Sequence, residues 1–147
     1  MKRSPALVPL GHDHHRALEA ALRLRRATDE SVSEDLAYFR EFWADHVHRR
    51  HFEIEEELVL PAITGDQAWD EMAERVRRDH RQIRAWADSA DSVGDAHTLG
   101  ALLNDHVRFE ERELFEFMEA RLDPGELDRL GRKVEAARPE ALGSGHE

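Results

Sequence analysis

Hydrophobic residues recur at steps of three and four along four long stretches of the chain, which is the spacing of one face of an α-helix. The stretches cover about residues 11–27, 31–60, 66–91 and 95–121, and short polar or glycine-containing breaks separate them. Amphipathic helices joined by short connections bury their apolar faces against one another. The sequence therefore predicts an all-α, antiparallel up-down-up-down four-helix bundle, with a short fifth helix at the C-terminal end.

A length of 147 residues is enough for one domain with a sizeable core. Residues 1–10, which contain two prolines, are expected to form an irregular lead-in, and residues 11–122 the four-helix bundle. Residues 123–137 are expected to form the short C-terminal helix, and residues 138–147 a flexible tail.

Polar residues mark the expected helix starts. Ser31 and Glu34 have the spacing of a capping box and would open the second helix. Asp66 and Asp123 are expected to be the N-caps of the third and the fifth helix.

One pattern occurs twice in the chain: a single His on one helix, followed by His-x-x-x-Glu on the next helix. Residues four apart lie on the same face of a helix, so each His and Glu of the second element point in one direction. Their apolar neighbours indicate that this direction is inward. The candidate site residues are His15, His51, Glu55, His80, His106 and Glu110.

The first helix offers two adjacent histidines for this site. It is expected to turn three residues toward the core, namely Leu18, Ala21 and Leu22. Leu18 lies four residues after His14 and three after His15, so both histidines are candidates. An alignment of residues 15–18 with residues 80–83 favours His15, and leaves His14 at the edge of the site or on the surface.

Four imidazoles and two carboxylates that converge in a core need compensation, because a buried unpaired carboxylate costs several kcal/mol. Core histidines satisfied by hydrogen bonds, or local His–Glu ion pairs, would not explain why all six converge. A dinuclear metal site would. Imidazole suits iron, copper, nickel and zinc. We favour two iron ions (Fe2+/Fe3+) with a bridging oxo or hydroxo group over dimanganese or a zinc–iron pair, with Glu55 and Glu110 as bridges and positions left open.

Composition excludes several other kinds of site. The formal net charge of −11 disfavours nucleic-acid and membrane partners. The chain has no cysteine, which excludes disulfides, thiolate metal sites and thiol catalysis. No apolar run reaches the roughly 18 residues of a membrane helix. We expect a cytoplasmic protein.

Several segments together resemble the hemerythrin-like, or HHE cation-binding, family. They are the Asp13-His14-His15-Arg16-Ala17-Leu18 opening, residues 51–61, Asp79-His80 and residues 106–115. The resemblance covers about residues 7–122. It implies a four-helix bundle with a non-haem diiron centre bridged by carboxylates. It also implies a role in binding or sensing O2, NO or iron, or in handling peroxide.

Two positions depart from the oxygen-carrying members of that family. Those carriers place a second His on the third helix where this chain has Arg84. They also take the carboxylate of the fourth helix from an Asp five residues after the His, whereas here Glu110 and Glu111 fill the fourth and fifth positions. These differences argue against O2 transport. Glu56 and Glu111, which follow the two bridging candidates, are assigned to the helix edges.

The leading hypothesis is a dinuclear metal protein that binds or senses O2, NO or redox state. An alternative is a diiron enzyme that handles peroxide, NO or Fe(II) oxidation. A further alternative is a helical interaction module that a metal stabilises. A sensor of this size would signal through a protein partner or a homo-oligomer.

Overall fold

The computed structural model describes residues 3–138, apart from the side chains of residues 46–49. This part of the chain is all α, without a strand, as predicted. Of the predicted tail, residues 138–147, only Arg138 belongs to the described residues. The elements in chain order are α1 (Val8–Arg25), α2 (Val32–Ala44), α3 (His46–Ile54), the π-helix η1 (Glu55–Val59), the 3-10 helix η2 (Leu60–Ala62), α4 (Gln67–Ser89), α5 (Val93–Phe109), the π-helix η3 (Glu110–Leu114), α6 (Phe115–Arg121) and α7 (Pro124–Ala137).

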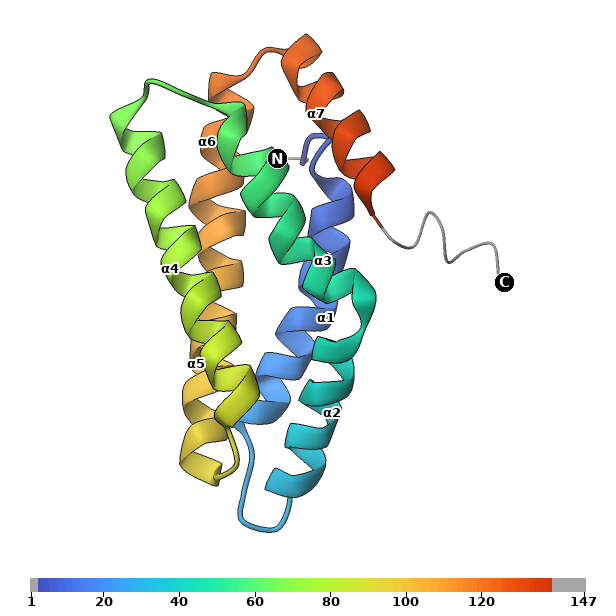
Figure 1. The fold of residues 1–147 in the computed structure, drawn as a ribbon, viewed down its shortest axis with the longest axis vertical. Coiled ribbons are helices and arrows are strands. Elements are labelled where there is room, and N and C mark those ends of the chain that lie inside the picture. Colours follow the sequence, from blue (N-terminus) through green and yellow to red (C-terminus); the bar gives the residue numbers. More distant parts are fainter. Residues whose placement is uncertain (1–2, 139–147) are drawn as a thin grey trace, which may run out of the picture.

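Four antiparallel arms form the bundle that the sequence predicts (Figure 1). The first arm is α1, the second is α2 with α3 and η1, the third is α4, and the fourth is α5 with η3 and α6. The short helix α7 runs along the side of the bundle at one end, beside the start of α1, and contacts η1. In the part that the structure describes, no helix has the length and apolar character of a membrane span.

All three predicted helix starts are confirmed, because Ser31, Asp66 and Asp123 directly precede α2, α4 and α7. Asp66 accepts a hydrogen bond from the first turn of α4, and Asp123 forms a reciprocal capping box with Glu126 at the start of α7. The capping box predicted for Ser31 and Glu34 is wrong, although α2 does begin after Ser31. Its hydroxyl donates instead to the carboxylate of Asp35, 2.7 Å away, and makes no bond to the backbone of α2.

The second and fourth arms are not the continuous α-helices that the sequence predicts. The second arm breaks at Asp45, whose φ of −59° and ψ of 121° lie outside the helical region. Both arms then contain one π-helix, and these π-helices begin at Glu55 and Glu110. Such wide turns are rare and occur preferentially at functional sites.

The inner face of α1 differs from the predicted one by one residue. Of the three residues predicted to face the core, Ala21 is buried, whereas Leu22 is 41% exposed and Leu18 is only partly buried. Ala17 and Leu24 are buried in their place. The cause is the close approach of α1 to α5, for which small residues are needed. A Cβ atom added at Gly100 of α5 would lie 2.9 Å from both the carbonyl oxygen of Ala21 and the Cβ of Leu24.

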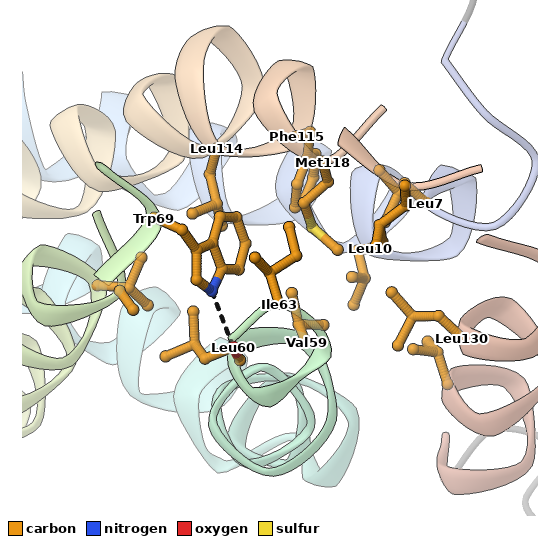
Figure 2. Packing of buried hydrophobic residues seen from close by; sticks show 14 of the residues in the cluster. Leu7, Leu10, Val59, Leu60, Ile63, Trp69, Leu114, Phe115, Met118 and Leu130 are labelled. Atoms are coloured by element: carbon orange, nitrogen blue, oxygen red, sulfur yellow. Dashed lines mark hydrogen bonds between the residues drawn. The ribbon is translucent and has the colours of Figure 1, made fainter. Parts of the chain in front are cut away.

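Two separate hydrophobic clusters fill the bundle. The cluster shown in Figure 2 lies at the end near α7 and includes Trp69, whose indole donates to the carbonyl of Leu60 at 2.9 Å. The second cluster fills the opposite end and includes Phe39, Ile83 and Leu99. On α4, His80 falls between the residues of the two clusters, so a polar layer separates them.

The close packing of α1 on α5 gives a first prediction. Gly100→Ala should lower the free energy of unfolding by about 1–3 kcal/mol, because the added methyl group overpacks a backbone contact. Gly94→Ala is the matched control on the same helix, where the new Cβ meets nothing closer than 3.9 Å. It should be neutral or stabilising by up to about 1 kcal/mol. Urea denaturation of both variants measures the difference, and equal effects would contradict the packing argument.

Candidate metal centre

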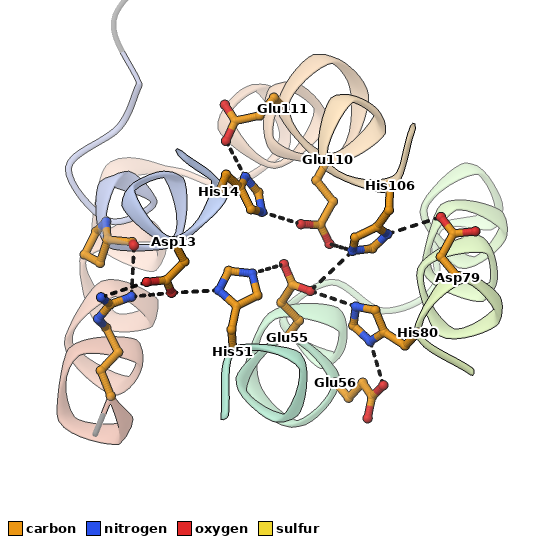
Figure 3. A network of polar contacts seen from close by, with 12 residues as sticks. Asp13, His14, His51, Glu55, Glu56, Asp79, His80, His106, Glu110 and Glu111 are labelled. Atoms are coloured by element: carbon orange, nitrogen blue, oxygen red, sulfur yellow. Dashed lines mark hydrogen bonds and ion pairs between the residues drawn. The ribbon is translucent and has the colours of Figure 1, made fainter. Parts of the chain in front are cut away.

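Six titratable side chains from the four arms meet in the layer between the two hydrophobic clusters (Figure 3). None of them is more than 5% exposed. They are His14 of α1, His51 of α3, Glu55 of η1, His80 of α4, His106 of α5 and Glu110 of η3.

Glu55 lies between two of the histidines. Its Oε2 is 3.0 Å from Nε2 of His51, and its Oε1 is 2.9 Å from Nε2 of His80. The two carboxylate oxygens therefore face different imidazoles, which is the arrangement that a bridging carboxylate requires.

Glu110 has the equivalent place between the other two histidines. Its Oε1 is 2.9 Å from Nε2 of His14, and its Oε2 is 3.3 Å from Nε2 of His106. Among the described residues, this Oε2 and this Nε2 are buried without a hydrogen-bond partner. Buried polar atoms almost always have a partner, so two such atoms in the centre of the cluster fit a cation between them.

The cluster divides into two overlapping groups that share both carboxylates. In each group the potential ligand atoms all lie within 4.8 Å of one another. One group consists of His14, His51, Glu55 and Glu110, and the other of Glu55, His80, His106 and Glu110. This donor set is consistent with a dinuclear metal site in which each ion has two imidazoles and two shared carboxylates.

An outer carboxylate lies behind each imidazole. Every Nδ1 faces a carboxylate oxygen on the neighbouring arm, at distances between 2.6 and 3.2 Å (Figure 3). The pairs are Glu111 with His14, Asp13 with His51, Glu56 with His80, and Asp79 with His106. Such a contact fixes the orientation of a ligating imidazole and directs the Nε2 lone pair at the metal.

None of these four carboxylates is among the site residues that the sequence predicts. The sequence predicts that Glu56 and Glu111 lie at helix edges, whereas both reach across to a histidine. A signal for them exists in the chain, because each half contains the dipeptides Asp-His and Glu-Glu at matching places. Arg84, which occupies the place of a histidine in the oxygen carriers, holds Glu56 with its Nη1 at 3.0 Å.

The structure places His15 outside the cluster, contrary to its expected inward position. His15 is exposed, whereas His14 is 4% exposed and stacks on Phe115 with 5.6 Å between the ring centroids. The other five predicted residues do come together. The error has the same cause as the shifted inner face of α1, since His14 shares that face with Ala17 and Ala21.

The charges in the cluster compensate one another. Burial opposes protonation of His51, but the negative charge of Glu55 and the hydrogen bond to Asp13 outweigh it and raise its pKa to about 10. Burial would likewise raise the pKa of Glu55, yet the charge of His51 and the surrounding hydrogen bonds hold it well below its usual range. His51 is therefore an imidazolium that donates from both ring nitrogens at neutral pH.

A small cavity adjoins one side of the cluster. The space open to the centre of a water-sized sphere is about 20 Å³, which admits roughly one small molecule. Its polar lining comes from Asp13, His14, His51 and His106, and its apolar lining from Ala17, Phe42, Trp43, Phe52, Leu103 and Val107.

Cation binding at this centre should release protons. A cation that binds Nε2 of His51 must displace a proton that a pKa of about 10 holds in place, so the apparent affinity should rise with pH. We expect about a tenfold increase per pH unit for each proton released, between about pH 6.5 and 8. Calorimetric Zn2+ titrations in buffers of different ionisation enthalpy measure the number of protons released. The same titrations at several pH values measure the apparent affinity, and an affinity independent of pH would contradict the prediction.

Comparison with known proteins agrees with this geometry. The chain matches the Hemerythrin HHE cation binding domain over residues 7–118, which is more than half of its length. No curated protein and no solved structure was found to match it. The matched region extends from α1 into α6 and contains all six buried His and Glu residues of the cluster. The chain therefore belongs to the hemerythrin HHE cation-binding domain family.

Proposed function

We propose that this domain holds two iron ions and uses them to bind or sense a small redox-active molecule such as O2 or NO. In this proposal Glu55 and Glu110 bridge the ions. His14 and His51 hold one ion, and His80 and His106 hold the other. The observation that carries the proposal is the pair of overlapping ligand groups that share both carboxylates.

The donor set favours iron over the alternatives. Each ion would have two imidazole nitrogens and two carboxylate oxygens, a mixed set that suits iron and leaves positions open in six-coordinate geometry. Closed four-coordinate sites are typical of structural zinc. Manganese prefers oxygen-rich surroundings, so the four imidazoles argue against a dimanganese centre. When bound, ferrous ions would supply the electrons that a diatomic ligand accepts.

The cavity beside His14 and His51 supports a small ligand. Its size admits a molecule about as large as water, and most of its lining is apolar. An apolar pocket of this size suits an uncharged diatomic molecule and excludes larger organic substrates. This ligand would then approach the ion held by His14 and His51.

Binding or sensing is favoured over turnover because the carboxyl group of Asp13 is ionised. Asp13 carries the carboxyl group of the cavity lining, and His51 and Arg138 both bind it. Its pKa is lowered, since the hydrogen bonds and charges of these partners overcome its burial. An ionised carboxylate in this position is a poor proton donor for peroxide or NO chemistry.

Metal analysis with spectroscopy tests the proposal. Protein purified aerobically from iron-supplemented cells should contain about two irons per chain and show near-ultraviolet charge-transfer absorption. The ferrous protein should bind NO without consuming it. Steady consumption of NO or peroxide, lost in His51→Ala and Glu110→Ala, would instead select the enzyme. A colourless protein that folds equally well without metal would rule out both the binding or sensing protein and the enzyme.

Adjacent histidines give a matched test of the ligand assignment. His14→Ala should weaken one of the two cation-binding steps by more than the 10–100-fold that is typical for loss of an outer partner. His15→Ala should leave both steps unchanged, because this side chain is exposed. Competition between the protein and a metal chelator measures both constants. The assignment fails if the two substitutions have the same effect.

A further inference from the structure

The C-terminal end of α7 reaches the metal centre through a buried ion pair. Arg138, directly after this helix, is only 7% exposed. Its Nη1 lies 2.8 Å from Oδ2 of Asp13 and 2.9 Å from the carbonyl oxygen of Pro9, and its Nη2 lies 3.2 Å from Oδ1 of Asp13. Oδ2 of Asp13 is also 2.7 Å from Nδ1 of His51. Two contacts therefore join the end of α7 to a candidate ligand.

The remaining attachment of α7 is apolar packing on the end of the bundle. Leu130 and Val134 are the buried apolar residues of this 14-residue helix. The helix also rests closely on the N-terminal segment at Gly131, where an added Cβ would lie 2.9 Å from Ala6. Leu127 and Ala137 pack against the same hydrophobic cluster and are partly buried. The ion pair of Arg138 with Asp13 is the contact that joins the end of this helix to the polar layer.

In the other half of the centre, the arginine that holds the outer carboxylate comes from a different part of the fold. Behind His80, the outer carboxylate is Glu56, and its cation is Arg84. Arg84 belongs to α4, one of the four arms. The arginine behind His51 thus comes from a peripheral helix, whereas the arginine behind His80 comes from the bundle itself.

We propose that docking of α7 and cation binding at His51 stabilise each other through Arg138 and Asp13. This inference rests on the proposed ligand role of His51. Arg138 is a positioning residue: its two nitrogens hold the carboxylate of Asp13 in the orientation that fixes the imidazole. When α7 leaves, Asp13 loses both of these donors and can turn away from His51.

The coupling acts in both directions. If undocking of α7 weakens cation binding by some factor, cation binding must favour the docked helix by the same factor. Outer partners of metal-ligating histidines typically contribute 10–100-fold to affinity. Arg138 acts one contact further out, so we expect a factor of about ten, at the lower end of that range. A redox or metal signal in the centre thereby reaches a helix on the surface.

Hydrogen exchange with Zn2+ as a redox-inert probe tests this coupling. In the full chain, two equivalents of Zn2+ should slow exchange of the backbone amides around Leu130 and Val134 about tenfold. Arg138→Gln should abolish this response and weaken one of the two Zn2+ constants about tenfold. Arg84→Gln is the matched control: it should weaken Zn2+ binding through Glu56 but keep the response of α7.

A steric variant separates coupling from the loss of a charge. Gly131→Leu should push α7 off Ala6 without altering any group at the centre, and should weaken the same Zn2+ constant that Arg138→Gln weakens. The inference is overturned if α7 exchanges freely in Gly131→Leu while both Zn2+ constants stay unchanged. Failure of the unmodified protein to bind Zn2+ would instead overturn the ligand assignment. Circular dichroism confirms that each variant remains helical.

Discussion

Removal of six titratable groups from water is the constraint on which this structure depends. The layer of histidines and glutamates lies between two hydrophobic clusters, so solvent cannot compensate its charges. Each imidazole instead has a carboxylate at both ring nitrogens, and arginines neutralise outer carboxylates such as Glu56 and Asp13. A buried charge that lost its partner would cost several kcal/mol. The cation-binding layer is therefore also what makes the relative position of the arms specific.

The outer contacts form a closed ring around the bundle. Asp13 of α1 holds His51 on the second arm, and Glu56 of the second arm holds His80 on the third. Asp79 of the third arm holds the histidine of the fourth, and the fourth arm returns to α1 through Glu111. Each neighbouring pair of arms is thus joined by one outer contact at the level of the centre. A change in one arm alters the orientation of a ligand on the next.

The bundle and five of the six clustered residues could be predicted from the sequence, because helical spacing places His51 with Glu55 and His106 with Glu110 on inner faces. The buried face of α1 could not be predicted in the same way. An assignment from large apolar residues fails where a helix packs through alanines against a glycine such as Gly100. The contacts of the outer carboxylates could not be predicted because they join different helices, whereas periodicity describes each helix separately. The wide turns at the two glutamates have no signal in residue spacing.

Those wide turns have a consequence for how the two hydrophobic clusters relate to each other. A π-turn accommodates one more residue than an α-turn, so the inward-facing positions shift along the chain at the charged layer. After Glu55 the buried positions are Val59 and Leu60, whereas Leu58 is only partly buried. In the second and fourth arms, the buried positions therefore follow one helical phase before the glutamate and a shifted phase after it. The buried positions of the two hydrophobic clusters are thus out of phase with each other in these two arms, and the shift occurs at Glu55 and Glu110.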